Sequence, residues 1–140
     1  MDKETFFART MHSPDSPERA ALRETLRAIS KALIPLHRHL IDAAKSDYAF
    51  AYEVQARPAQ LIELLQNDPF FAWLKPLTAL IVDIDEMART DFDPQQAAAI
   101  GGRLETLLAE KQYVEVLQRE VEVAMAHAAV RRTLQRLTQS

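Results

Sequence analysis

Histidine and carboxylate side chains are the groups of this chain that could hold a metal ion or move a proton. His37 borders the apolar stripe of a long helical segment, and Asp47 lies on the opposite flank of the same stripe. Asp85 lies at the edge of a second stripe, and His127 lies in the last segment. Imidazole and carboxylate groups from three helices are a usual ligand set. These four residues are therefore the candidate ligand or metal site, between the first, third and last helices.

The spacing of the candidate ligands argues against catalysis. Carboxylate-bridged metal bundles use Glu-x-x-His pairs, because residues three apart project together from a helix, and this sequence contains none. It also lacks cysteine, histidines four residues apart, a Gly-x-Ser-x-Gly elbow and a glycine-rich phosphate loop. We therefore assign no catalytic residue and no cofactor. Each of the four candidates also fits a structural role at a helix end or in a side-chain pair.

Aromatic side chains suggest a second kind of site. Tyr48, Phe70 and Trp73 could line a pocket that opens where two proline-kinked helices splay apart. The same three side chains also fit ordinary packing in an apolar core. They are the candidate pocket-lining residues, and we expect such a pocket to bind a small ligand.

Three further apolar residues indicate a contact between subunits. Phe71, Val82 and Val130 lie off the buried stripes of their helices. Apolar positions that the core does not use are available for an interface. These residues are therefore the interface candidates, for a homodimer or for another protein partner.

Helices must position all of these residues, and proline dipeptides mark where the helices begin. In three dipeptides a capping side chain precedes a proline: Ser16-Pro17, Asp68-Pro69 and Asp93-Pro94. Proline is favourable in the first turn of a helix, because the N–H that it lacks has no partner there. Arg57-Pro58 marks a fourth start. Between these points apolar residues recur at three- and four-residue steps. The sequence therefore predicts a compact all-α bundle of about five helices.

Two of the expected helices are long and contain a proline. The first runs from 17 to about 56, and its apolar stripe stays in phase on both sides of Pro35. The third runs from 69 to about 89 and contains Pro76. Proline removes one backbone hydrogen bond without necessarily ending a helix. We therefore predict a kink at each of these prolines.

The remaining helices are shorter or ambiguous. A short helix is expected from 58 to about 67, and another begins at 94 with Gly101 on its buried stripe. A glycine there favours close approach of a neighbouring helix or a local hinge. Residues 111–137 carry apolar residues on two sides. They form either one helix buried on two sides or two helices that meet near Glu120.

Length and composition describe one small globular unit. The chain has 140 residues and a formal net charge of −3 at pH 7. This fits a single domain, with 1–16 as a loose lead-in and 17–140 as the helical bundle. The small, evenly divided charge argues against a nucleic-acid partner. No apolar run is long enough to cross a membrane, and the absence of cysteine and of a secretion signal favours the cytoplasm.

Five stretches of the sequence carry a resemblance to other proteins. They are residues 36–42, 47–48, 68–77, 84–86 and 126–131. These stretches resemble an uncharacterised family of small, soluble bacterial proteins. The resemblance implies an all-helical fold, and it implies no particular activity, cofactor or catalytic residue.

Two hypotheses about function follow from the sequence. The first is a non-enzymatic interaction or regulatory module that uses an apolar surface or groove. The alternative is a bundle that binds a small ligand or a metal, including an enzyme, at His37, Asp47, Asp85 and His127. Convergence of these four side chains in the fold would favour the alternative.

Overall fold

The computed structural model describes residues 15–138. Within this range it contains six α-helices, one 3₁₀-helix and no strand, which confirms the predicted all-α class. The number of helices exceeds the expected five, because the last segment is divided. The lead-in expected for residues 1–16 lies almost wholly outside the described residues.

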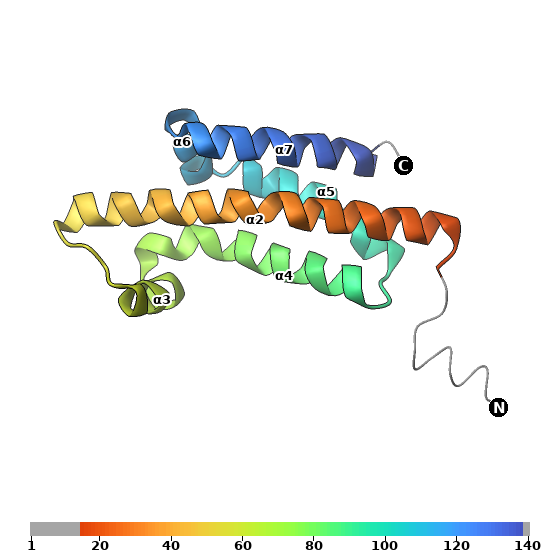
Figure 1. The fold of residues 1–140 in the computed structure, drawn as a ribbon, viewed down its shortest axis with the longest axis horizontal. Coiled ribbons are helices and arrows are strands. Elements are labelled where there is room, and N and C mark those ends of the chain that lie inside the picture. Colours follow the sequence, from red (N-terminus) through yellow and green to blue (C-terminus); the bar gives the residue numbers. More distant parts are fainter. Residues whose placement is uncertain (1–14, 139–140) are drawn as a thin grey trace, which may run out of the picture.

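The longest element is α2 (Pro17–Tyr52), which spans the length of the bundle in Figure 1. Ser16 caps its first turn, because the Ser16 side chain accepts a hydrogen bond from the Arg19 N–H at 3.1 Å. The helix ends before the expected position near 56, because Glu53 adopts the left-handed conformation with φ of 55°. Pro35 lies inside the helix, and the kink expected there stays a prediction.

The chain then folds back through α3 (Pro58–Asn67), the 3₁₀-helix η1 (Pro69–Leu74) and α4 (Lys75–Arg89). The continuous, kinked helix predicted from 69 to 89 is therefore wrong. Pro76 lies in the first turn of α4, where a helix needs no N–H from it. Pro76 stands in the first turn of a helix, as Pro17, Pro58 and Pro94 do, and not in the interior of a longer one.

The last three helices are α5 (Pro94–Leu108), α6 (Lys111–Arg119) and α7 (Val121–Thr138). Of the two alternatives for the last segment, the structure has two helices. Glu120 separates them in an extended conformation, with φ of −108° and ψ of 113°. The core therefore receives Tyr113 and Val116 from one helix and Val123, Val130 and Leu134 from the other.

The helices pack in layers around α2. In Figure 1, α3 and α4 lie on one side of α2 and α6 and α7 on the other, while α5 crosses behind α2 between α4 and α7. The principal partners of α2 are α7 and α4, and α5 packs against both α4 and α7. In residues 15–138, no helix combines the length and apolar character that crossing a membrane requires. The central α2 therefore presents different faces to two sets of helices.

Two of the three interface candidates belong to this core. Phe71 and Val130 are 0% exposed, because Phe71 packs under the end of α2 and Val130 lies on the inner face of α7. Their side chains are used within one chain and are not available to a second one, which corrects the prediction for both. Val82 is 58% exposed and keeps its place as an interface candidate.

Candidate functional site

His37 forms a bond between α2 and α4. Its Nε2 lies 2.8 Å from the Thr78 hydroxyl oxygen, and that hydroxyl donates to the Leu74 carbonyl at 3.2 Å. Because the hydroxyl proton is used in this way, His37 Nε2–H is the donor to Thr78. Burial lowers the pKa of His37 below its ordinary value of 6.5. The structure therefore favours a neutral His37 that fixes the register of two helices.

His127 is bonded through both ring nitrogens. Nδ1 lies 2.6 Å from the Tyr113 hydroxyl on α6, and Nε2 lies 3.4 Å from Arg131 Nε, one turn along α7. Arginine can only donate, so Nε2 accepts and Nδ1–H donates to Tyr113. Burial and the neighbouring Arg131 lower the pKa of His127, and burial raises the pKa of Tyr113. This arrangement connects α6 to α7 and leaves no ring nitrogen for a substrate.

The two carboxylate candidates form ion pairs elsewhere. Asp47 pairs with Arg119 and so joins α2 to α6, whereas Asp85 pairs with Arg89 on its own helix at 3.0 Å. Both pairs are largely exposed to solvent.

The four candidate ligands therefore do not meet. His37, Asp47, Asp85 and His127 each have a separate partner. Among residues 15–138, no group of three or more histidine, aspartate or glutamate side chains could hold a metal ion. The prediction that these four side chains converge is wrong, because each side chain bonds to a different residue: Thr78, Arg119, Arg89 and Tyr113, respectively.

The pocket-lining candidates are also divided between two places. Tyr48 and Phe70 belong to an aromatic cluster with Tyr52 and Phe71, in which ring centroids lie 4.7 to 5.9 Å apart. Such spacings are those of packed aromatic pairs. Trp73 lies outside this cluster and lines a separate cavity. The three candidates therefore do not line one pocket.

An apolar groove runs between α2 and α4 and is closed at one end by α3. It has a volume of about 420 Å³, and we call it the α2–α4 groove. The residues that line it include His37, Ile41, Leu65, Leu74, Thr78 and Ala79. The only bonded polar pair among them is His37 and Thr78.

Three exposed aliphatic side chains each lie one helical turn from a residue that lines this groove. Ile34 is 59% exposed, Ile62 is 61% exposed and Val82 is 58% exposed. Ile34 lies one turn before His37, Val82 lies one turn after Thr78, and Ile62 lies one turn before Leu65. Sequence reasoning found Val82 because it lies off the buried stripe. The same criterion would have found Ile34 and Ile62.

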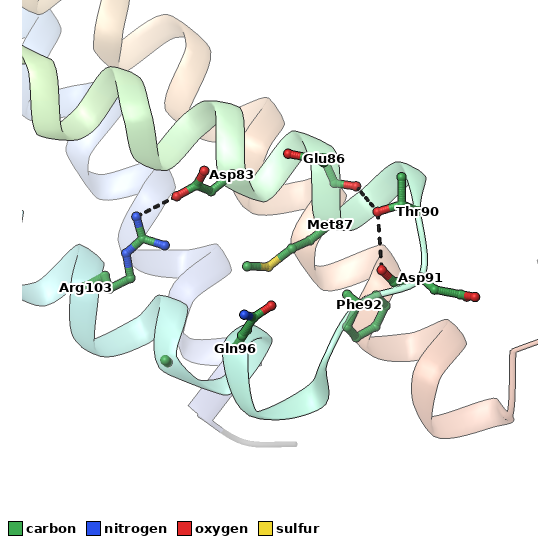
Figure 2. Close-up of a pocket in the computed structure, with 9 residues that line it drawn as sticks. Asp83, Glu86, Met87, Thr90, Asp91, Phe92, Gln96 and Arg103 are labelled. Atoms are coloured by element: carbon green, nitrogen blue, oxygen red, sulfur yellow. Dashed lines mark hydrogen bonds and ion pairs between the residues drawn. The ribbon is translucent and has the colours of Figure 1, made fainter.

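A second recess lies between α4 and α5 and is polar. Figure 2 shows Arg103 reaching toward Asp83 across this recess, and the two form an ion pair of 2.8 Å. At the other end, the Thr90 hydroxyl lies 2.8 Å from the Glu86 carbonyl oxygen. The recess has a volume of about 460 Å³, and its lining combines polar side chains with the apolar Met87, Phe92 and Ala99. The Asp83–Arg103 ion pair joins α4 to α5, whereas the Thr90 hydroxyl bonds to the end of its own helix.

No family model, curated protein or solved structure matches this chain. The resemblance to small helical bacterial proteins therefore remains an expectation. The interpretation of the site rests on the geometry of its own residues.

Proposed function

We propose that this protein is a non-enzymatic interaction module and that the α2–α4 groove is its binding surface. The observation that carries the proposal is that three large exposed aliphatic side chains, Ile34, Ile62 and Val82, each lie one helical turn from a residue that lines a single apolar groove. Exposed apolar residues scattered singly are normal on a protein surface, whereas a contiguous group is typical of an interface. The groove fits an apolar helical face better than a reacting substrate, because its one bonded polar pair is already satisfied.

The register of the two helices supports this grouping. Arg23 on α2 contacts the Ala88 carbonyl on α4 at 3.1 Å, and His37 contacts Thr78. Residue numbers rise on one helix as they fall on the other, so α2 and α4 are antiparallel. Ile34 and Val82 therefore lie across the groove from one another, one turn along from the His37–Thr78 bond.

The charge pattern of α4 favours a second copy of this chain as the partner. Lys75, Ala79, Val82 and Glu86 follow one another at helical spacing along its outer face, and all four are exposed. If two copies of α4 packed antiparallel about a two-fold axis, Ala79 of each subunit would face Val82 of the other. Each Lys75 would then face Glu86 of the partner subunit. Neither Lys75 nor Glu86 forms an ion pair within the described part of the chain.

Sedimentation velocity over a series of protein concentrations tests the proposal. We expect a reversible monomer–dimer equilibrium for the wild type. Val82→Glu should weaken the dimer roughly a hundredfold, because a two-fold contact contains each substitution twice and buries two uncompensated charges. Val121→Glu is the matched control, since Val121 is 73% exposed on α7 and lies away from the groove.

Two results would contradict the proposal. One is a wild-type protein that stays monomeric at every concentration, because the groove then has no second copy as its partner. The other is a dimer that Val82→Glu and Val121→Glu affect equally, because the contact then lies elsewhere on the surface.

A further inference from the structure

A separate apolar cavity lies on the other side of Leu74 from the α2–α4 groove. It has a volume of about 330 Å³ and lies where α2, η1, the start of α4 and the α5–α6 turn meet. Its apolar walls include Leu40, Trp73, Leu77 and Leu108. Leu40, Leu77 and Leu108 are buried core residues, so these walls belong to the rigid part of the bundle. A volume of this size, with mostly apolar walls, is typical of a small-molecule site.

One carboxylate gives this cavity its charge. Glu110 is the only charged residue among those that line it. Its Oε2 accepts a hydrogen bond from the Tyr113 N–H at 3.1 Å and so caps α6. Within residues 15–138, Glu110 Oε1 forms no hydrogen bond and no ion pair. The carboxylate therefore has one oxygen fixed by the fold and one free to accept from a ligand.

The other polar side chains of the cavity carry no charge. The Tyr113 hydroxyl is bonded to His127. Gln112 is exposed at the rim, in the first turn of α6. The cavity therefore offers a ligand an indole ring, aliphatic walls and one carboxylate.

We propose that this cavity binds a small apolar amine, with an aromatic or branched aliphatic body against Trp73 and the leucines and an ammonium group at Glu110. An ammonium group gains a charge-assisted hydrogen bond from the free carboxylate oxygen. A ligand carboxylate would instead meet Glu110 with like charge in a largely apolar space. This inference is independent of the α2–α4 groove, because it rests on different residues.

The only tryptophan of the chain lies in the cavity wall, so its fluorescence reports on binding there. Phenethylamine, phenethyl alcohol and hydrocinnamate share a phenyl ring on a short chain and differ in the charge of the end group. We expect a saturable change in Trp73 fluorescence with the amine, a weaker one with the alcohol and the weakest with the carboxylate. Absence of a saturable change with all three compounds, or equal affinity for all three, would overturn the inference.

Substitution of Glu110 tests the role of the charge. Glu110→Gln keeps a side-chain oxygen that can accept from the Tyr113 N–H and removes the negative charge. We expect the affinity for phenethylamine to fall roughly fivefold, toward that of the alcohol, while the affinity for the alcohol stays the same. An unchanged preference for the amine in Glu110→Gln would contradict the proposed ligand class.

Two alanines provide a matched test of position. Ala72 and Ala79 are both exposed, but Ala72 lines the cavity and Ala79 lines the α2–α4 groove. Ala72→Leu should partly fill the cavity and weaken binding of the amine, whereas Ala79→Leu should leave it unchanged. Equal effects of the two substitutions would place the amine outside the cavity and overturn the inference.

Discussion

His127 and its neighbours illustrate the residue scale. The Tyr113 hydroxyl lies 2.6 Å from Nδ1, and Arg131 lies 3.4 Å from Nε2. Protonation of Nε2 would remove the acceptor for Arg131 and place two cations side by side. Burial and Arg131 accordingly lower the pKa of His127, and burial lowers the pKa of His37. The fold therefore holds both histidines in their neutral form.

These pKa shifts predict a loss of stability toward acid. The unfolded chain takes up protons near pH 6.5, the ordinary histidine value, whereas folded His127 takes them up only at lower pH. The free energy of unfolding should therefore be greatest above pH 6.5 and fall as the pH passes down to the lowered pKa values of the folded chain. Urea denaturation at a series of pH values measures this slope.

Single histidine variants separate the contributions to that slope. His127→Gln should make the fall toward acid shallower, because the variant keeps the lowered pKa of His37 but loses that of His127. His39→Gln is the control, since His39 does not belong to the contact of His127 with Tyr113 and Arg131. A slope that His127→Gln leaves unchanged would contradict the assignment of the neutral form.

Arg23 provides a second test at the residue scale. Its guanidinium donates to the carbonyls of Met87, Ala88 and Thr90 at 2.7 to 3.2 Å and pairs with Asp15 at 2.8 Å. Lysine cannot reproduce this planar set of donors. Arg23→Lys should therefore lower the free energy of unfolding by about 1 to 2 kcal/mol.

The control for Arg23 is another arginine on the same helix. Among residues 15–138, Arg27 pairs only with Glu24 on α2 and is exposed, so Arg27→Lys should change stability by less than about 0.5 kcal/mol. Urea denaturation of the two variants makes the comparison. Equal losses in both would show that Arg23 does not join α2 to the end of α4.

At the scale of elements, local chemistry predicted most helix starts. The side chains of Ser16, Asp68 and Asp93 each accept a hydrogen bond from a backbone N–H in the turn that follows, as the proline dipeptides indicated. The kink predicted at Pro76 is wrong because apolar residues have similar spacing in a 3₁₀-helix and in an α-helix. The spacing cannot show where one gives way to the other.

The glycine pair of α5 gives a prediction at this scale. The helix continues unbroken through Gly101 and Gly102, and an added Cβ at Gly102 would meet nothing within 4 Å. Gly102→Ala should raise the free energy of unfolding by about 0.5 to 1 kcal/mol, because alanine loses less backbone entropy in a helix.

Gly101 should tolerate the same change. Its added Cβ would lie 3.6 Å from Leu137 Cδ2 and 3.9 Å from Leu134 Cδ1, which are ordinary contact distances. The approach of α7 to α5 therefore does not require glycine there. Thermal unfolding of Gly101→Ala and Gly102→Ala tests both statements, and destabilisation by Gly102→Ala would indicate a hinge instead of a regular helix.

At the scale of the whole molecule, the site could not be predicted from single helices. His37, Asp47, Asp85 and His127 each have a position on a helix that fits a shared site. Their actual partners depend on which helices are neighbours and in what register, and helical periodicity carries neither piece of information. For the same reason the sequence could not show the α2–α4 groove, whose lining comes from α2, α3, η1 and α4.

Exchange of charges along α4 tests the proposed self-association most directly. Sedimentation equilibrium should show that Lys75→Glu weakens the dimer, because each altered side chain would face Glu86 of the partner subunit. The double variant Lys75→Glu with Glu86→Lys restores opposite charges across the two-fold axis and should restore the dimer toward wild-type affinity. Failure of the double variant to recover any affinity lost by Lys75→Glu would contradict the account.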